Sequence, residues 1–326
     1  MGPVAERLTA VDGLAVGHAT LADAGTGCTV VLAPPGGMRA AAHIRGRATG
    51  TREFDALSPR HIVPRVDALL LTGGSAYGLG AADGVMRWLR ERQRGFPVGV
   101  TIVPIVPTAV VFDLTPIGRS DRWPGPDEGY AACQAAGPEF AEGAVGAGTG
   151  ATVGKALGIE HAMKGGVGTW AVRHDALVVG ALAVVNAWGD VRDARGAILA
   201  GARDGQGFAD ARHRLATGAD PLNRFRAPAA APANTTLVVV GTNTAVERDE
   251  LAEIARNAAD AMGRRITPVG TMVDGDVIFA VSVGTRVLAS PVAVELLAQD
   301  AVEVAIERAV TMARGTPDVP GVADRP

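Results

Sequence analysis

Ala233-Asn-Thr-Thr-Leu-Val-Val-Val240 is the stretch that decides the fold, because an Ala/Pro-rich segment changes there into a run of large aliphatic residues. Threonine and valine favour extended backbone, so the sequence predicts a strong strand over residues 235–242. The preceding residues, 201–233, show little apolar periodicity and end in Arg-Ala-Pro-Ala-Ala-Ala-Pro-Ala. We interpret them as a linker.

Strands and helices alternate on both sides of this linker. Ahead of it, the apolar patterns predict strands within 14–33, at 68–71, at 169–173 and at 176–186, and helices at 81–94 and 128–134. After it, they predict a helix over 246–262, a strand over 277–283, a helix over 292–312 and a disordered tail from Gly315. Two strands are too few for a stable sheet. We therefore expect the last strands to enter a sheet built by the earlier part, in a single α/β domain of residues 1–326.

The overall composition excludes several classes of protein. The 326 residues carry 31 Lys+Arg against 34 Asp+Glu, a net charge of −3, without the basic block that binds nucleic acid. Hydrophobic residues make up 48%, which excludes intrinsic disorder. The longest apolar stretch, 98–111, is too short to span a membrane. With two cysteines and no secretory pattern in residues 1–13, the chain is predicted to be soluble and cytoplasmic, without a nucleic-acid or membrane partner.

Matches to three known motifs fail on spacing. The glycine-rich stretch 146–155 is not a phosphate-binding loop, because Thr149 and Ala156 occupy positions that need a glycine and a hydroxyl residue. The turn at 73–78 is not a serine nucleophile elbow, because Tyr77 stands where glycine is required. The six histidines have no ligand spacing. We therefore expect no nucleotide, metal or cofactor site.

Thr235 offers a specific chemistry at the start of the predicted strand. If the 234–235 bond breaks, Thr235 gains a free α-amine beside its hydroxyl, and this amine is able to act as the general base for the nucleophile. The break itself would be an attack of Thr235 Oγ1 on the carbonyl carbon of Asn234, giving an ester that water hydrolyses. From residue types alone, Asn-Thr at a strand start is also an ordinary turn. Both interpretations stay open at this level.

Three further polar residues are candidates for the same site, and two lysines stand out by their rarity. Asp274 and Asp276 flank a glycine, where they either form a polar turn or orient a nucleophile and its amine. Asn186 ends an apolar strand, where it is either a satisfied amide or an oxyanion-hole donor. Lys155 and Lys164 are the two lysines among 31 basic residues, and a residue type this rare in the chain suggests a specific role. From the sequence alone, a codon bias towards arginine is sufficient for both.

Taken together, these segments resemble the DmpA-like aminopeptidases and amidases, a family that includes the endo-type 6-aminohexanoate (nylon) oligomer hydrolases. The matching segments follow the family order along most of the chain. They are Leu71-Thr-Gly-Gly-Ser-Ala-Tyr-Gly-Leu79, Pro107-Thr-Ala-Val-Val-Phe-Asp113, 148–155, Val184-Val-Asn-Ala-Trp-Gly-Asp190, Asn234-Thr-Thr236 and Met272-Val-Asp-Gly-Asp276. The resemblance makes the nucleophile the favoured interpretation of Thr235.

The resemblance implies a four-layer αββα sandwich of the N-terminal-nucleophile type. It also implies self-cleavage between Asn234 and Thr235 into an α-chain, 1–234, and a β-chain, 235–326. The residues that carry over into catalysis and processing are Thr235, Lys155, Asn186, Asp274 and Asp276. Because members of the family assemble as oligomers, we expect a homo-oligomer of αβ protomers that acts on a small peptide or amide without a cofactor.

One position departs from the family pattern. Several characterised members have, at the position of Phe112, a Tyr whose hydroxyl lies in the active site, and Phe112 has no hydroxyl to donate. We take Phe112 and Tyr77 as candidates for the substrate pocket. The expected activity is amide hydrolysis through an acyl-enzyme on Thr235. The alternatives are a threonine-nucleophile acyltransferase of the ornithine acetyltransferase kind and a non-catalytic small-molecule-binding relative that never processes.

Overall fold

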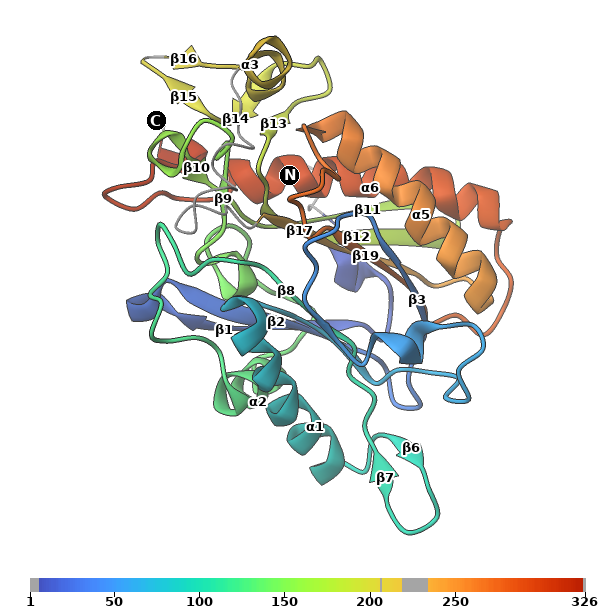
Figure 1. Ribbon diagram of the computed structural model, residues 1–326. Coiled ribbons are helices and arrows are strands. Elements are labelled where there is room, and N and C mark those ends of the chain that lie inside the picture. Colours follow the sequence, from blue (N-terminus) through green and yellow to red (C-terminus); the bar gives the residue numbers. More distant parts are fainter. Residues whose placement is uncertain (1–5, 206, 219–233, 325–326) are drawn as a thin grey trace.

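Two five-stranded β-sheets lie face to face in the computed structural model of the chain, and a pair of helices covers the outer side of each (Figure 1). The structure describes residues 6–205, 207–218 and 234–324. The first sheet consists, in spatial order, of β1 (Ala15–Leu21), β2 (Thr26–Leu32), β5 (Ala68–Thr72), β8 (Thr108–Val110) and β4 (Thr51–Arg52). The second consists of β11 (Gly166–His174), β12 (Leu177–Asn186), β17 (Thr235–Thr242), β19 (Val277–Ser282) and β3 (Arg39–Ile44). The covering helices are α1 (Ala81–Glu91) and α2 (Pro126–Gln134) on the first sheet, and α5 (Arg248–Arg265) and α6 (Pro291–Thr311) on the second. The expected αββα sandwich is confirmed.

The alternation of side chains along each strand explains why the layers stack in this order. On β5, Leu69 and Leu71 lie in the core between the sheets, whereas Leu70 packs towards α1. On β17, Leu237 and Val239 face the core between the sheets, and the alternate valines pack beneath α5 and α6. A strand buried on both faces needs a continuous apolar run, and this is what the sequence has at both places.

The last two long strands lie inside the second sheet rather than at its edge. β17 pairs antiparallel with β12 and parallel with β19, and β19 pairs antiparallel with β3. The register places Asn186, the last residue of β12, opposite Thr235, the first residue of β17. Residues 235–324 are therefore held by strand pairing and core contacts on both sides, independently of the peptide bond that precedes them.

In the described part of the chain, short strands, short 3-10 turns and the helix α3 complete the fold. The remaining strands are β6 (Phe96–Pro97), β7 (Ile102–Val103), β9 (Thr152–Val153), β10 (Met163–Lys164), β13 (Asp190–Arg192), β14 (Ile198–Ala200), β15 (Arg203–Asp204), β16 (Gly207–Phe208) and β18 (Ile266–Thr267). The short helix is α3 (Ala211–Thr217).

The predicted linker is wrong for its first part, where β15, β16 and α3 form an ordered unit. The Asp190 carboxylate accepts hydrogen bonds from the backbone N–H groups of Ala202 (2.8 Å) and Ala211 (2.7 Å) and so holds the residue before β15 and the first residue of α3. Contacts of this kind leave no periodic pattern in a sequence. The second part, 219–233, including the Ala/Pro-rich run, lies outside the described residues.

The prediction of a disordered tail from Gly315 is also wrong up to residue 324. Val319 is buried, and the Asp324 carboxylate accepts hydrogen bonds from the N–H groups of Gly315 and Gly321. The carbonyl oxygen of Pro320 accepts a hydrogen bond from the Lys164 N–H (2.9 Å). The proline content that indicated disorder instead belongs to a turn that packs on β10.

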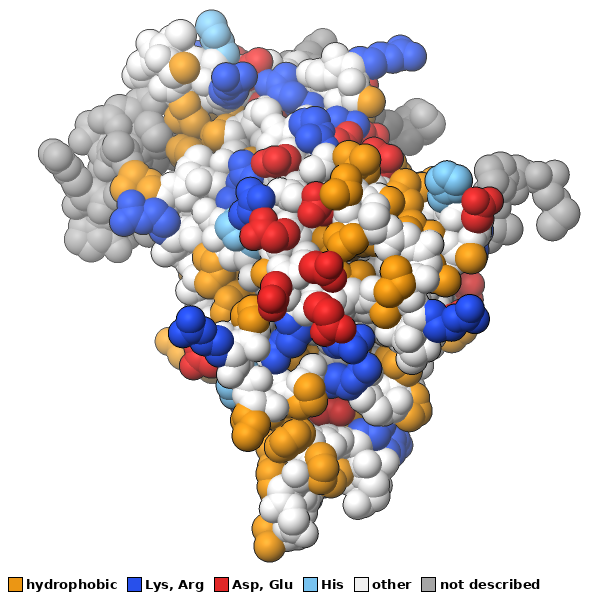
Figure 2. All heavy atoms as spheres, turned by 90° about the vertical axis from the view of Figure 1, so that its right-hand side faces the viewer, with side chains coloured by type: hydrophobic (Ala, Val, Ile, Leu, Met, Phe, Trp, Pro, Cys, Tyr) orange, Lys and Arg blue, Asp and Glu red, His pale blue; other side chains and the backbone are white. Residues whose placement is uncertain are grey.

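Charged side chains of both signs share the surface, and acidic ones gather near the middle of the face seen in Figure 2. α5 contributes four exposed carboxylates, those of Asp249, Glu250, Glu253 and Asp260. Among the described residues, no helix combines the length and the apolar content that crossing a bilayer requires.

Candidate active site

The start of β17 brings a hydroxyl group against the peptide bond that precedes it. Asn234 is fully buried and Thr235 is 4% exposed. Thr235 Oγ1 donates a hydrogen bond to the carbonyl oxygen of Asn234, with 2.7 Å between the two oxygens. The hydroxyl group therefore lies next to the carbonyl group that it would attack in a self-cleavage.

Lys155 and Asn186 meet on the neighbouring strand end. Lys155 Nζ donates to Asn186 Oδ1 (2.7 Å) and to the Asn186 carbonyl oxygen (3.3 Å), and the Thr152 N–H also donates to Oδ1 (3.0 Å). Asn186 Nδ2 donates to the carbonyl oxygen of Phe112 (2.9 Å). These bonds fix the orientation of the amide group and leave one Nδ2 hydrogen for another acceptor. Burial lowers the pKa of Lys155 to about 7, an effect that the negative charges of Asp274 and Asp113 oppose.

Asp274 and Asp276 lie in the turn that leads into β19, and this turn runs beside Asn234. Asp276 accepts the N–H of Thr236 on Oδ1 (2.7 Å) and the N–H of Gly270 on Oδ2 (3.0 Å). Asp274 Oδ2 accepts both the N–H and the hydroxyl group of Thr271. Burial and the charge of Asp274 raise the pKa of Asp276 to about 7, and burial also raises the pKa of Asp274. Each of these buried carboxyl groups is therefore harder to ionise than a carboxyl group in water.

The structure thus gathers all the catalytic candidates of the sequence analysis at one end of the second sheet. The links that join them are the Asn186–Thr235 strand pair, the Lys155–Asn186 hydrogen bonds, the Asn234–Asp274 bridge and the Asp276–Thr236 hydrogen bond.

Sequence reasoning missed the role of Lys164. Its side chain is 1% exposed, and its Nζ donates to the carbonyl oxygens of Gly148 (2.8 Å), Ala151 (2.8 Å) and Gly165 (2.7 Å). The glycine-rich segment therefore wraps its carbonyl groups around an ammonium group, whereas a phosphate loop would present N–H groups. The rarity of lysine was the available signal, and it applied to Lys164 as much as to Lys155.

Asp113 was part of a family segment but was given no role. Its carboxylate accepts the hydroxyl group of Thr26 (2.7 Å) and the N–H of Gly74 (2.6 Å), and burial raises its pKa to about 6. It follows Phe112, which is half-buried and joins the site through its carbonyl oxygen. Asp113 therefore ties the 73–74 turn of the first sheet to the end of the second.

Tyr77 lies on the helical turn that follows Gly74. Its ring is 60% exposed and stacks on Trp123, with 4.3 Å between the ring centroids and 20° between the planes. A Cβ atom on Gly74 would come within 2.4 Å of Trp123 Cβ, so the turn and the stacked pair are in close contact. A partly exposed aromatic pair thus adjoins the turn that Asp113 holds.

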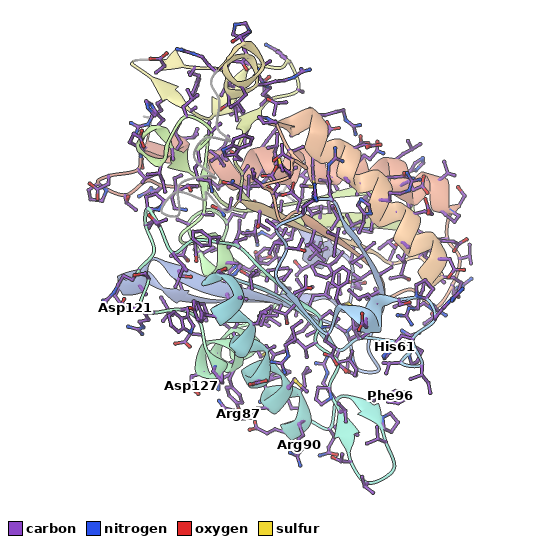
Figure 3. The ribbon with its side chains drawn as sticks, viewed as in Figure 1. His61, Arg87, Arg90, Phe96, Asp121 and Asp127 are labelled. Atoms are coloured by element: carbon purple, nitrogen blue, oxygen red, sulfur yellow. The ribbon has the colours of Figure 1, made fainter. Side chains whose placement is uncertain are left out.

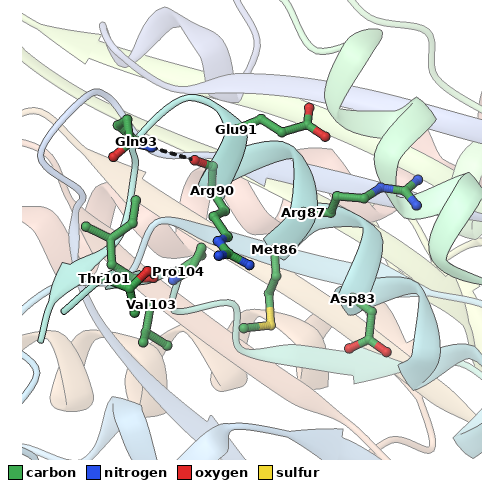
Figure 4. A pocket seen from close by; sticks show the side chains of 10 residues that line it. Asp83, Met86, Arg87, Arg90, Glu91, Gln93, Thr101, Val103 and Pro104 are labelled. Atoms are coloured by element: carbon green, nitrogen blue, oxygen red, sulfur yellow. Dashed lines mark hydrogen bonds between the residues drawn. The ribbon is translucent and has the colours of Figure 1, made fainter.

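A large cavity lies elsewhere, between α1 and the β6–β7 hairpin (Figure 4). It has a volume of about 870 Å³, and Arg87, Arg90 and Met86 are among the residues that line it. None of the candidate residues lines it, and Figure 3 shows Arg87 and Arg90 on the outer side of the first sheet's helices. Among the described residues, no group of three or more His, Cys, Asp or Glu side chains is arranged as a metal site.

Comparisons with known proteins agree with this arrangement. The sequence profile of peptidase family S58 matches residues 6–321. An uncharacterized aminopeptidase of Mycobacterium tuberculosis is 45% identical over 295 residues, which cover 85% of this chain and 81% of the relative. A 6-aminohexanoate-oligomer endohydrolase of Kocuria sp. is 32% identical over 275 residues, 83% of this chain and 73% of the relative.

Solved structures extend the similarity to the fold. The L-aminopeptidase D-Ala-esterase/amidase of Ochrobactrum anthropi, described as a prototype of the serine aminopeptidases with a variant of the Ntn-hydrolase fold, has a TM-score of 0.71 to this chain at 21% identity. A β-aminopeptidase of Burkholderia sp. has a TM-score of 0.71 at 19% identity. Each comparison covers 98% of this chain and 91% of the other. The two facing sheets and their helices are therefore an Ntn-hydrolase fold.

Proposed function

The chain belongs to peptidase family S58 and hydrolyses amide or peptide bonds, and from this premise we propose that it cuts itself between Asn234 and Thr235 and then uses Thr235 as its N-terminal nucleophile. The observation that carries the proposal is the 2.7 Å contact between Thr235 Oγ1 and the Asn234 carbonyl oxygen, at a buried strand start beside Lys155, Asn186 and the aspartate pair.

The self-cleavage proceeds in two steps. Thr235 Oγ1 bonds to the Asn234 carbonyl carbon while the C–N bond breaks, and the hydroxyl proton moves to the leaving nitrogen, which becomes a free α-amine. Water then attacks the ester, which leaves a carboxylate on Asn234 and returns a proton to Thr235 Oγ1. Residues 235–324 stay in place because β17 and β19 remain paired with β12 and β3.

Hydrolysis of a substrate reuses the same hydroxyl group. The α-amine of Thr235 accepts the hydroxyl proton as Oγ1 attacks the amide carbonyl, and it returns that proton to the leaving amine. Water then hydrolyses the acyl-enzyme, which releases the acid and returns a proton to Oγ1. The second Nδ2 hydrogen of Asn186 donates to the developing oxyanion, a contribution of ~3 kcal/mol for a donor of this type. Lys155 polarises the hydroxyl group, and the negative charge of Asp274 and Asp276 balances the new ammonium group.

The relatives indicate the substrate class. One is named an aminopeptidase and another a 6-aminohexanoate-oligomer endohydrolase, so we propose short peptides and linear amide oligomers as substrates. The stacked Tyr77–Trp123 pair offers an apolar surface for the chain of such a substrate, because aromatic rings bury apolar area at low entropic cost.

Denaturing electrophoresis and intact mass test the self-cleavage directly. The purified protein is expected as two fragments, 1–234 and 235–326, and the smaller one should begin with Thr-Thr-Leu. Thr235→Ala should remain one chain without hydrolytic activity, whereas the matched control Thr236→Ala should cleave, since the Thr236 hydroxyl group makes no hydrogen bond to the described residues. A wild-type protein that hydrolyses amides as one intact chain would contradict the proposal.

A further inference from the structure

Gly275 donates its backbone N–H to the oxygen atom on which charge develops during self-cleavage. The distance from Gly275 N to the Asn234 carbonyl oxygen is 2.6 Å, and the same oxygen accepts Thr235 Oγ1 at 2.7 Å. The Gly275 N–H and the Thr235 hydroxyl group behave differently during the reaction. When Oγ1 bonds to the carbonyl carbon its hydrogen leaves, so of these two donors the Gly275 N–H is the one that persists on the oxyanion.

The peptide group between Asp274 and Gly275, which carries this donor, is held in place from its other end. The carbonyl oxygen of Asp274, in the same peptide plane as the Gly275 N–H, accepts the N–H groups of Arg47 (2.7 Å) and Ala48 (2.9 Å). The Asp276 side chain accepts the N–H of Thr236, on the far side of the scissile bond. The donor is therefore fixed before the reaction starts, which is the condition for strong electrostatic stabilisation.

Steric contacts explain why residue 275 is a glycine. A Cβ atom there would lie 2.6 Å from Thr235 Oγ1 and 2.6 Å from the Ala48 carbonyl oxygen. Only glycine lets this backbone approach both the nucleophile and the carbonyl group that it attacks.

We propose that the backbone N–H of Gly275 is the oxyanion donor of the self-cleavage, distinct from the Asn186 amide that serves the substrate. The assignment rests on the proposed self-processing. In the uncut chain the Gly275 N–H donates to the Asn234 carbonyl oxygen, whereas Asn186 Nδ2 donates to the Phe112 carbonyl oxygen.

Replacing Gly275 by glycolic acid through nonsense suppression exchanges the N–H for an ester oxygen and adds no side chain. We expect self-cleavage of freshly translated protein to slow by about 10²–10³-fold, the usual loss for one oxyanion donor. The same replacement at Gly99, in the exposed β6–β7 turn, should leave the rate unchanged. Wild-type cleavage together with equal cleavage of the 275 ester would overturn this proposal alone, whereas an uncleaved wild type would overturn the proposed function.

A second measurement does not depend on the folding of the ester variant. In isotope-labelled Thr235→Ala protein, a scalar coupling across the hydrogen bond should connect the Gly275 ¹⁵N nucleus with the Asn234 carbonyl ¹³C nucleus. A Gly275 amide that lacks this coupling would refute the proposed donor.

Discussion

Replacing Lys164 by methionine removes the ammonium group that the glycine-rich segment surrounds and keeps the length of the side chain. The carbonyl oxygens of Gly148, Ala151 and Gly165 then each lose a hydrogen bond to a charged donor, although Gly148 still accepts the Ala151 N–H and Ala151 still accepts the Gly165 N–H. A hydrogen bond to a charged group contributes about 1.5–3 kcal/mol. Removing the charge also removes its desolvation cost, which offsets part of this loss. We expect a net decrease in the free energy of unfolding of about 3 kcal/mol near pH 6, where Lys164 is protonated in the folded protein.

The pH dependence gives this prediction a second readout. Burial lowers the pKa of Lys164 to about 7 in the folded protein, and the ordinary value in the unfolded chain is about 10.4. Between these values the unfolded chain holds a proton that the folded protein lacks, so the free energy of unfolding rises with pH by about 1.4 kcal/mol per unit. Lys164→Met loses this slope, and its deficit should therefore grow by about 2 kcal/mol from pH 8 to 9.5.

Urea unfolding followed by circular dichroism measures both quantities. All variants carry Thr235→Ala, so that one uncut chain unfolds in each case. With an m-value near ~3 kcal/mol/M, the midpoint of Lys164→Met should lie about 1 M below the parent. Arg195→Met is the matched control, because it removes an exposed cation and should change stability by less than about 0.5 kcal/mol. Equal midpoints and equal pH slopes for Lys164→Met and the parent would refute the reasoning.

Four shorter predictions concern the active site. Lys155→Arg should give an uncut chain on a denaturing gel, because a forked guanidinium group does not fit the buried contacts with the Asn186 amide; normal processing would mean that lysine has no special role there. Gly275→Ala should slow cleavage at least about 100-fold, because its Cβ atom lies 2.6 Å from Thr235 Oγ1, and gel time courses that match the wild type would contradict this contact. Asp276→Asn in the Thr235→Ala background should flatten the pH dependence of urea unfolding. The pKa of Asp276 in the folded protein, about 7, exceeds its value in the unfolded chain, so the free energy of unfolding falls by about 1.4 kcal/mol per pH unit as the pH rises from 5 to 7. The same slope in Asp276→Asn and its parent would exclude this carboxyl group as the source. Tyr77→Ala should leave self-cleavage and kcat intact and raise KM several-fold in steady-state kinetics with an amide oligomer, and an unaltered KM would place the substrate elsewhere.

The pattern of apolar residues predicted the secondary structure correctly where the neighbouring residues along the chain determine whether a side chain is buried. The apolar runs at 68–71 and 235–242 predicted strands, the first of them covered on both faces, and in the structure the side chains of both strands alternate between two cores. Thr235 became the candidate nucleophile because a hydroxyl residue opens such a strand, and the family resemblance supplied the residues around it. Peptidase family and enzyme class could thus be predicted from the sequence, and both are confirmed.

The tertiary structure alone decided which polar groups meet. The Asp113 carboxylate accepts a hydrogen bond from the hydroxyl group of Thr26, 87 positions away in the sequence. The Asp276 carboxylate accepts one from the N–H of Thr236, 40 positions away. The Gly275 N–H reaches the Asn234 carbonyl because strand pairing sets the register of the two segments. The buried Lys164 ammonium group donates to the carbonyl groups of Gly148 and Ala151, 16 and 13 positions away in the sequence. Periodicity reports which face of an element is apolar; it carries no record of hydrogen bonds between segments far apart in the chain. The sequence by itself therefore determined the layers and the candidate nucleophile, while sheet register and the satisfaction of buried polar groups determined the site around it.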